Sequence, residues 1–207
     1  MAKLAWIAGP ACRMCGAPIP PVGTAGATCP RCTDYGLKFD RTVALGVYQG
    51  FLQELVLRTK GRAEAPLTLG LGRILAARVA STAELAEPDV VVPVPMYWLR
   101  RLRRGVNGPD LLAECVARRL GAPLASRLLR RTRNTPPQRT LPPTERRKNI
   151  RGALAMRAGY HLKRAHVLLV DDVLTTGGTC NEAARVLKQN GAALVSVAVV
   201  ARGIGAT

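Results

Sequence analysis

The segment from Val167 to Thr179 constrains the fold of this chain more than any other, and it reads Val-Leu-Leu-Val-Asp-Asp-Val-Leu-Thr-Thr-Gly-Gly-Thr. Its four consecutive apolar residues predict a short strand that is buried on both faces, as the strands of a parallel sheet are. Two carboxylates, Asp171 and Asp172, end this strand, and a loop leads from them into an apparent helix over Asn181–Asn190. The segment therefore predicts an α/β fold with a ligand beyond the carboxyl end of the strand.

The loop combines small hydroxyl and glycine residues, which are Thr175, Thr176, Gly177, Gly178 and Thr179. A turn of this kind at a helix N-terminus cradles an anion, because main-chain N–H groups and the helix dipole both point at the bound charge. Carboxylates beside such a cradle suit a ribose 5-phosphate. Asp171 and Asp172 would accept hydrogen bonds from its 2′- and 3′-hydroxyls, and the loop would hold its 5′-phosphate. An ordinary turn after a strand with a solvated acidic end is the alternative interpretation.

Two other phosphate-binding motifs do not fit this segment. No Gly-Lys-Ser/Thr follows the loop, as a Walker-type loop requires, and the Gly-x-Gly-x-x-Gly dinucleotide fingerprint is missing. The 13 residues instead resemble, at every position, the phosphoribosyl pyrophosphate (PRPP) signature of type I phosphoribosyltransferases. This resemblance implies that the ligand is PRPP or a related ribose 5-phosphate, and that Mg²⁺ binds together with PRPP.

Length and charge set the broad class. A chain of 207 residues suits one domain of ordinary size with a small appendage. Lys and Arg outnumber Asp and Glu by 31 to 13, and the formal net charge of +18 favours polyanionic partners such as pyrophosphate-bearing substrates or nucleic acid. An arginine-rich compositional background accounts for part of the excess. The charge is nevertheless concentrated in two places, Arg100–Arg104 and Arg127–Arg151.

We expect a cytoplasmic protein without a membrane span. No stretch of the sequence approaches the length of a transmembrane helix. The apolar run within Met1–Pro10 is too brief for a secretory signal, and Pro10-Ala11 before Cys12 makes a poor lipoprotein cleavage site.

Two Cys-x-x-Cys pairs, separated by thirteen residues, contain four of the six cysteines, namely Cys12, Cys15, Cys29 and Cys32. Two such pairs can supply a closed tetrahedral thiolate site for structural Zn²⁺, with no position left open for water. Folding of the segment would then depend on the metal. Two disulfides are the main alternative, which a reducing cytoplasm disfavours. A thioredoxin-like redox motif would place one such pair at the head of a helix.

The remaining two cysteines are predicted to lie in helices. Cys115 is expected to be an apolar packing residue. Cys180 begins the helix after the phosphate loop, a position where a thiol pKa is expected to fall, although we interpret it as a packing residue and not a catalytic one.

Alternation of strands and helices predicts a parallel sheet flanked by helices over 39–207, preceded by a zinc-binding segment over 1–38. The helix Leu67–Leu85 is expected to turn Leu69, Ile74, Leu75 and Val79 toward the core. Strands are expected at Thr42–Tyr48, at Val90–Val92 with Val94, at Leu124–Arg130, and at Ala193–Ala201. Further helices are expected at Leu52–Thr59 and at Gly108–Leu120. The stretch Thr132–Lys148, rich in proline and charge, is predicted to be a long loop of functional importance.

Taken together, the chain resembles the ComF family of competence-associated bacterial proteins, in which an N-terminal zinc segment precedes a phosphoribosyltransferase domain. The resemblance covers nearly the whole chain. Besides the cysteine pairs and the PRPP signature, it rests on Tyr48-Gln49-Gly50 leading to Lys60, Val91-Val92-Pro93-Val94-Pro95, Arg104-Gly105-Val106-Asn107, and Arg131-Thr132 through Gln138 and Arg146 to Asn149-Ile150-Arg151-Gly152. One departure is that Val106 and Gly108 flank Asn107 where the family usually has Phe and Gln.

The resemblance implies roles for residues outside the signature. Val94 and Pro95 begin the loop that binds pyrophosphate, together with Arg100 and Arg101, while Arg104 acts with Asp171 and Asp172 in catalysis. Guanidinium groups suit this task because they make forked hydrogen bonds to phosphate oxygens. Arg131–Arg151, which includes Arg146, corresponds to the loop that closes over the reacting centre. A solvated surface charge is the alternative for each arginine taken alone.

Two functions follow from the sequence. The first is Mg²⁺-dependent transfer of a phosphoribosyl group from PRPP to an unidentified nitrogen acceptor. The second, implied by the family's link with DNA uptake and by the positive charge, is a non-catalytic protein that binds single-stranded DNA or a DNA-uptake helicase. With two Phe and two Trp, the chain offers few stacking platforms for single strands. The sequence leaves open whether the chain forms a homo-oligomer.

Overall fold

The computed structural model describes residues 6–7, 9–19, 29, 32, 36–61, 64–96, 107–135 and 149–204. In this part of the chain the strands are β1 Arg41–Val47, β2 Val90–Pro93, β3 Leu129–Arg131, β4 Leu154–Met156, β5 His166–Leu174 and β6 Leu194–Arg202. The α-helices are α2 Gly50–Arg58, α3 Ala65–Ala80, α5 Gly108–Leu120 and α7 Gly178–Gln189, and a 3₁₀ turn, η1, spans Ala83–Leu85. None of the described helices is long and apolar enough to span a membrane.

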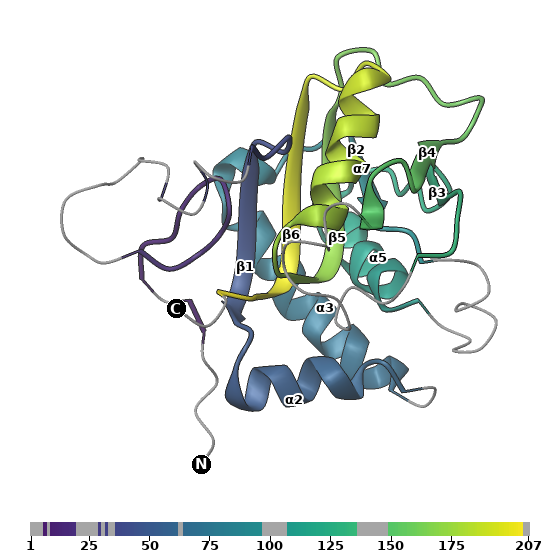
Figure 1. Cartoon of the computed structure of the whole chain (residues 1–207). Helices are drawn as coiled ribbons and strands as arrows, with labels where there is room; N and C mark the ends of the chain where they lie inside the picture. The colour runs from purple at the N-terminus through teal and green to yellow at the C-terminus, as the bar shows by residue number, and fades with distance from the viewer. Residues whose placement is uncertain are drawn as a thin grey trace.

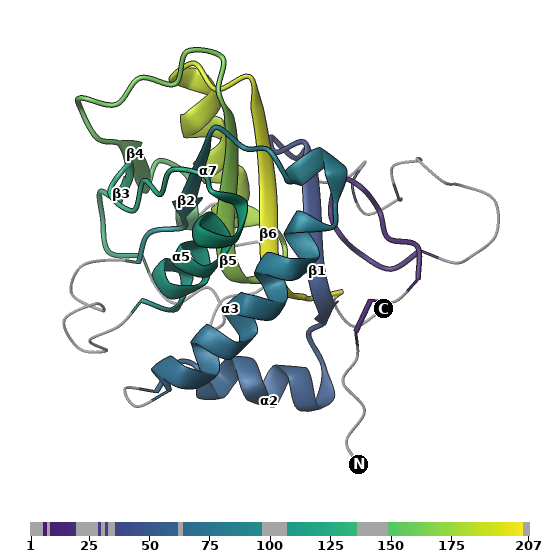
Figure 2. The ribbon, with the colours of Figure 1, turned by 180° about the vertical axis from the view of Figure 1, so that it is seen from behind.

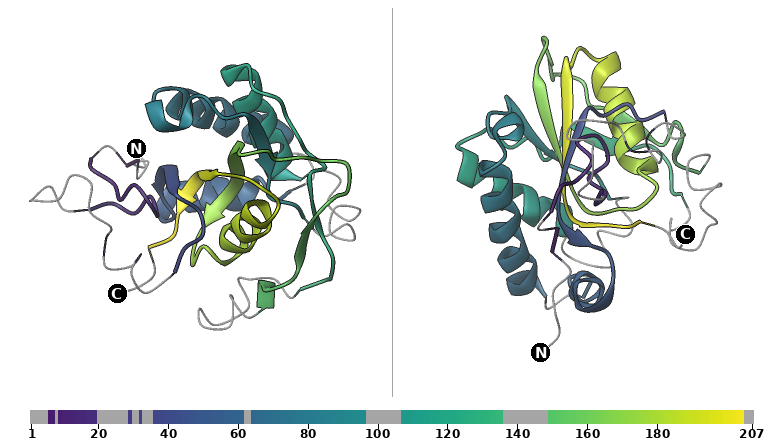
Figure 3. Two further views of the ribbon diagram at one scale, coloured as in Figure 1. Left: turned by 90° about the horizontal axis from the view of Figure 1, so that it is seen from above. Right: turned by 90° about the vertical axis from the view of Figure 1, so that its left-hand side faces the viewer.

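Four strands form a parallel sheet in the order β1-β6-β5-β2, while β3 and β4 form a separate antiparallel pair (Figure 1). Helix α7 covers one face of the sheet, and α3 and α5 cover the other, as the view from behind shows (Figure 2). The views from above and from the side show the sheet between these two helical layers (Figure 3). The predicted fold, a parallel sheet flanked by helices, is confirmed.

The sheet has a hydrophobic core on each face because successive side chains of a strand point to opposite sides. On β5, Val167 and Leu169 pack with α7 and the β3–β4 pair, whereas Leu168 and Val170 pack with α2, α3 and α5. Both cores consist mainly of Val, Leu and Ala, and Phe39 joins the core on the α7 side. The β5 run Val167–Val170 is fully buried, as the sequence predicted for a central parallel strand.

The chain reverses its direction of winding between β2 and β5. From β2 the chain passes through α5 to Leu124, which bridges Val91 in parallel fashion on the outer side of the sheet. From β5 it passes through α7 to β6, toward the inner side. The two crossover helices therefore lie on opposite faces, and their connections diverge at the carboxyl ends of β2 and β5. Ligands of open α/β sheets bind at such a point.

Several predicted elements differ in detail. The helix predicted over Leu67–Leu85 ends at Ala80, since the main-chain N–H of Ser81 closes the last turn and η1 follows. Ile74 was expected in the core and is 47% exposed, whereas Leu75 and Val79 are buried. The region predicted as the strand Leu124–Arg130 contributes the Leu124 bridge and then β3. Strand β4 was not predicted at all, because its three residues carry no periodic signal.

Helices α3 and α5 touch closely at Gly72. A Cβ atom at this position would lie 2.9 Å from the Cys115 Sγ, which is closer than real Cβ contacts come, and 3.1 Å from the Cys115 Cβ, which is tighter than most of them. Glycine is therefore required where the two helices cross. Cys115 is partly buried there, which confirms its expected packing role in α5.

The substitution Gly72→Ala should destabilise the protein by about 1–3 kcal/mol, because an extra methyl group overpacks the crossing of α3 and α5. Gly70→Ala is the matched control in the same helix, since a Cβ there meets nothing within 4 Å. It should stabilise the protein by up to about 1 kcal/mol through helix propensity alone. Urea unfolding measures both. Recovery of stability in Gly72→Ala with Cys115→Ala would assign the loss to this contact, and equal effects of the two alanines would contradict it.

Candidate active site and metal centre

The acidic pair lies where β5 extends beyond the end of its neighbour β2. The ladder between β2 and β5 ends at Pro93 and Val170, while β5 stays paired with β6 through Asp171, Val173 and Leu174. Asp171 and Asp172 therefore have β6 on one side and an open sheet edge on the other. The main-chain N–H of Asp172 donates to Asp171 Oδ1 at 2.8 Å, which orients the first carboxylate.

The phosphate-loop region presents a row of main-chain N–H groups. Gly177 adopts φ 75° and caps α7, a left-handed conformation that favours glycine. Among the hydrogen bonds of the described residues, none uses the main-chain N–H groups of Thr176 to Cys180. The first turn of α7 holds no acidic side chain. Main-chain N–H groups exposed in this way at a helix N-terminus are suited to an anion, so the anion cradle stays a prediction for this loop.

The side chain of Lys60, which lies shortly after α2, is close to the acidic pair. Its Nζ lies 3.6 Å from Asp172 Oδ2, and both side chains are partly exposed. The sequence placed Lys60 in a family motif but assigned it no role at the site. A cation beside Asp172 balances one of the two carboxylates, whereas Asp171 makes no ion pair with any of the described residues.

Burial and the neighbouring carboxylate of Asp172 raise the pKa of Asp171 well above its ordinary range. The Asp171 Oδ2 atom also lies 4.0 Å from the Cys180 Sγ. Burial, followed by the charges of Asp171 and Asp172, raises the pKa of Cys180 well above that of a free thiol. The expected lowering at the start of a helix is therefore wrong, because these two effects outweigh the helix dipole. Cys180 is a buried core residue, as its packing interpretation requires.

Arg131 on β3 joins the end of β2 to the acidic pair. Its Nε donates to the Pro95 carbonyl at 2.9 Å, its Nη1 donates to the Thr135 hydroxyl, and its charge opposes the upward pKa shift of Asp171. The neighbouring Val94 side chain is buried in the core, so only its main chain can face a ligand. Arg131 was quoted in the sequence as part of a motif and not as a site residue. Its hydrogen bond to Pro95 and its charge near Asp171 make it a candidate site residue.

Other predicted site residues lie outside the described part of the chain. These are Arg100, Arg101, Arg104 and Arg146. From the motif that contains Arg104, only Asn107 is described. It is buried at the start of α5, where its amide nitrogen donates to Asp110 Oδ1 at 2.9 Å and its own Oδ1 has no partner among the described residues.

The two ends of the predicted closing loop are held together near the site. Arg133 Nη2 donates to the carbonyls of Asn149 and Arg151, and the Thr132 N–H donates to Ala153. Glu182 on α7 accepts from the Gly152 N–H at 2.8 Å and pairs with Arg185. Burial raises the pKa of Glu182, but these hydrogen bonds outweigh it and the net shift is downward. Residues 132–135 and 149–153 are thus fastened to α7.

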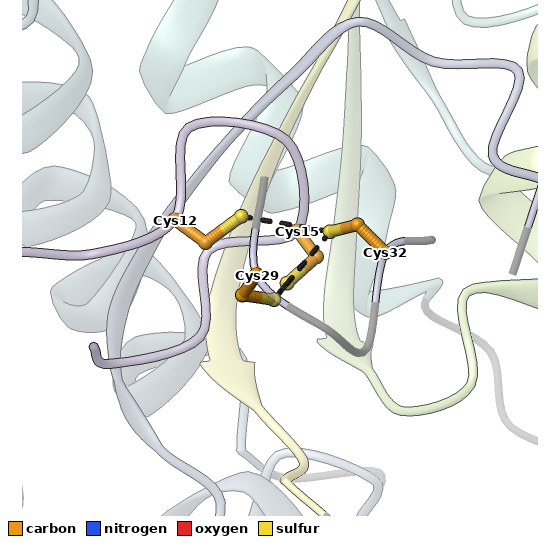
Figure 4. A group of neighbouring side chains, drawn as sticks. All are labelled: Cys12, Cys15, Cys29 and Cys32. Carbon is orange, nitrogen blue, oxygen red and sulfur yellow. Dashed lines mark hydrogen bonds between the residues drawn. The ribbon is translucent and has the colours of Figure 1, made fainter. Parts of the chain in front are cut away.

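The four cysteines of the two Cys-x-x-Cys pairs gather into one buried cluster, and their Sγ atoms all lie within 4.8 Å of one another (Figure 4). Contacts of 3.5 Å join Cys12 to Cys32 and Cys15 to Cys29, and one of 3.6 Å joins Cys29 to Cys32. These separations exceed a disulfide bond of about 2.05 Å. They approach the edge of about 3.8 Å expected for a sulfur tetrahedron around Zn²⁺ at 2.3 Å. The donor set therefore fits zinc.

The thiols of this cluster titrate differently. Burial raises the pKa of Cys29 and of Cys32 above that of a free thiol. For Cys12 burial also raises the pKa, but hydrogen bonds from main-chain groups, led by those of Cys29 and Cys15, bring it down to about 7. Of Cys12, Cys29 and Cys32, Cys12 thus most readily provides a thiolate for a metal.

Comparison with known proteins identifies the family to which the chain belongs. A family model described as "Phosphoribosyl transferase domain" matches residues 102–207. Competence protein F of Haemophilus influenzae is 34% identical over 84% of this chain and 78% of its own length. The chain belongs to the ComF family. DNA utilization protein YhgH of Salmonella typhi is 34% identical over 90% of the chain and 81% of its own length, and competence protein ComFC of Bacillus subtilis is 29% identical over 92% and 77%. The predicted ComF membership is confirmed.

The substitution Asp171→Asn should stabilise this ComF protein at neutral pH by roughly 1 kcal/mol, or about 2–4 °C in Tm, because it removes a partly buried charge beside Asp172. The wild type should gain stability as the pH falls through the raised pKa, and the gain should be complete below the ordinary value of 3.8. The variant should lack this gain.

Thermal unfolding from neutral to acidic pH measures both effects. Glu114→Gln on the exposed face of α5 is the control, with a change near zero. A lower Tm for Asp171→Asn at neutral pH would contradict the assignment.

Proposed function

We propose that this protein binds Mg²⁺–PRPP and transfers the phosphoribosyl group to a nitrogen acceptor. The observation that carries the proposal is the juxtaposition at one sheet edge of Asp171 and Asp172 with the open N–H groups of Thr176 to Cys180. The carboxylates match the ribose hydroxyls, and the N–H groups match the 5′-phosphate. The winding reversal lies beside Pro95, where ligands of such sheets bind and where the sequence predicts pyrophosphate.

In this proposal the chain acts by positioning and charge. The nitrogen lone pair of the acceptor forms a bond to the ribose C1 carbon as the bond from C1 to the pyrophosphate oxygen breaks. Pyrophosphate leaves with the electron pair, and the acceptor nitrogen loses its proton. When bound with the substrate, Mg²⁺ would neutralise part of the phosphate charge, as suits an ion that keeps substrate and water ligands. Arg131 and Lys60 add positive charge beside the acids, while Arg100, Arg101, Arg104 and Arg146 stay predictions from the sequence.

We also propose that Cys12, Cys15, Cys29 and Cys32 hold one structural Zn²⁺. Burial of all four sulfurs and their near-tetrahedral spacing support this assignment. Four protein thiolates complete the usual coordination of zinc, so the ion would supply folding energy and would not activate water.

Calorimetry of PRPP binding with and without Mg²⁺ tests the first proposal. The wild type should bind only with Mg²⁺, and the double variant Asp171→Asn with Asp172→Asn should lose at least about 100-fold in affinity, because two hydrogen-bonded charges are removed. Glu114→Gln should bind as the wild type does. A folded double variant that keeps its affinity would show that the acids do not contact the ribose. A wild type that binds no PRPP would refute the function.

A second candidate function is favoured by a specific surface. Residues 127–135 and 149–164 carry eight Arg and Lys residues and no Asp or Glu. Arg127, Arg130 and Arg157 are exposed there, on or beside the β3–β4 pair, and make no ion pair within the described part of the chain. Such a surface suits the backbone of single-stranded DNA. The relatives named for competence and DNA utilization agree with this idea. A helicase partner and self-association stay predictions.

Replacement of Arg127, Arg130 and Arg157 by Gln should weaken binding to a single-stranded oligonucleotide. It should also reduce the slope of log affinity against log salt by about 2, because each lost phosphate contact contributes about 0.7. Affinity for Mg²⁺–PRPP should not change. The control replaces Arg73, Arg78 and Arg119, which are exposed on the opposite helical layer. Fluorescence anisotropy over a salt series provides the measurement, and equal losses in both triple variants would rule out this surface.

A further inference from the structure

Arg202, the last residue of β6, is a buried cation with an unusual set of partners. Its side chain is 4% exposed. Its Nε donates to the Cys15 carbonyl at 2.7 Å, and its Nη1 donates to the carbonyls of Leu174 at 2.9 Å, Thr175 at 2.6 Å and Gly203. Within the described part of the chain, all acceptors of its hydrogen bonds are thus main-chain carbonyls.

These partners belong to two different parts of the molecule. Cys15 is one of the four clustered thiols. Its carbonyl belongs to the turn Cys12–Gly16, which the Gly16 N–H closes by donating to the Cys12 carbonyl. Leu174 ends β5, and Thr175 is the first residue of the phosphate loop. One guanidinium group therefore fixes the position of the cysteine turn relative to the start of the loop.

A buried guanidinium tolerates little rearrangement. It stays charged at any pH at which the protein folds, so the loss of a hydrogen bond cannot be offset by loss of the proton. An unpaired buried charge is strongly unfavourable. If the Cys15 carbonyl moves away, Arg202 must follow it or find another acceptor, and either response disturbs its bonds to Leu174 and Thr175.

A second contact joins the same two regions. Leu37 packs against the cysteine cluster, and a Cβ at Gly177 would lie 3.5 Å from its Cδ2. The main-chain N–H of Lys38 donates to Asn181 Oδ1, on the first turn of α7. The phosphate loop is therefore contacted at both of its ends by residues that pack on, or hydrogen-bond to, the cysteine segment.

We propose that Arg202 is a positioning residue that couples metal binding at the cysteine cluster to the geometry of the phosphate loop. Metal binding fixes the turn at Cys15, Arg202 transmits this to Thr175, and the loop N–H groups are held ready for a phosphate. By linkage, an occupied loop tightens metal binding by the same factor. The coupling rests on the proposed function in two respects: the four thiols hold a metal, and the loop ligand is a phosphate ester.

The first test measures Mg²⁺–PRPP affinity by calorimetry on the full chain, zinc-loaded and after removal of zinc with a chelator. Zinc removal should weaken affinity about tenfold in the wild type, a size typical of coupling between two sites. Arg202→Met should have the lower affinity already and respond less than about twofold to zinc. Arg202→Lys keeps the charge without the forked geometry, and should likewise lose most of its response. Arg13→Met is the matched control, since Arg13 lies in the same turn but is exposed and pairs with Glu84.

A second measurement keeps this inference separate from PRPP binding. Hydrogen exchange by mass spectrometry should follow the amides of Asn181 and Gly203, which flank the loop and donate to Gly177 and Leu174. In the wild type these amides should exchange about tenfold faster without zinc, with 154–156 unchanged. This comparison needs no variant to fold and no PRPP to bind. If PRPP does not bind but exchange responds, the proposed function fails and the coupling stands. An unchanged exchange rate, or the full tenfold zinc response in both Arg202 variants, would overturn the coupling.

Discussion

The candidate site depends on the unequal lengths of two paired parallel strands. Strand β2 stops at Pro93, and the Val94 N–H makes the last bond to β5 at Val170. Proline cannot donate to a ladder, so Pro93 and Pro95 end pairing on this side, while β6 supports β5 to Leu174. Asp171 and Asp172 thus stand on a strand that is rigid on one side and open on the other. A ligand can reach the acids without any loss of sheet hydrogen bonds.

The charge distribution at this edge is costly without a ligand. Two adjacent carboxylates repel each other, and Lys60 neutralises the outer one, Asp172, from a distance of 3.6 Å. The inner one, Asp171, has its pKa raised by burial and by Asp172, opposed by Arg131. Hydroxyl groups that donate to both carboxylates would remove much of this cost. Such a site is less stable than an apolar one but ready for its ligand, which is the usual compromise at binding sites.

Local sequence patterns correctly predicted the features that depend on residues close to one another in the sequence. The run Val167–Val170, the acids and the Gly/Thr loop follow one another in the sequence and are found so in the structure. Sequence could not predict the role of Arg202, which meets Cys15 across 187 positions, or that of Lys60 at Asp172. The error at Cys180 is of the same kind, because burial and the charge of Asp171 come from tertiary packing and not from the helix position.

The cysteine segment lies along one edge of the sheet and also contacts the candidate site through Arg202. Strand β1 is an edge strand, and an unpaired edge invites association with other chains. Ile7 donates to Leu45, Trp6 bridges Gly46, and the Thr42 N–H and hydroxyl donate to the carbonyls of Arg13 and Met14, so residues before the sheet lie along β1 (Figure 1). The same turn that covers this edge at Thr42 reaches Arg202 through Cys15. Metal bound by the four thiols would therefore stabilise the edge of the sheet and the phosphate loop together, because both are fastened to one short turn.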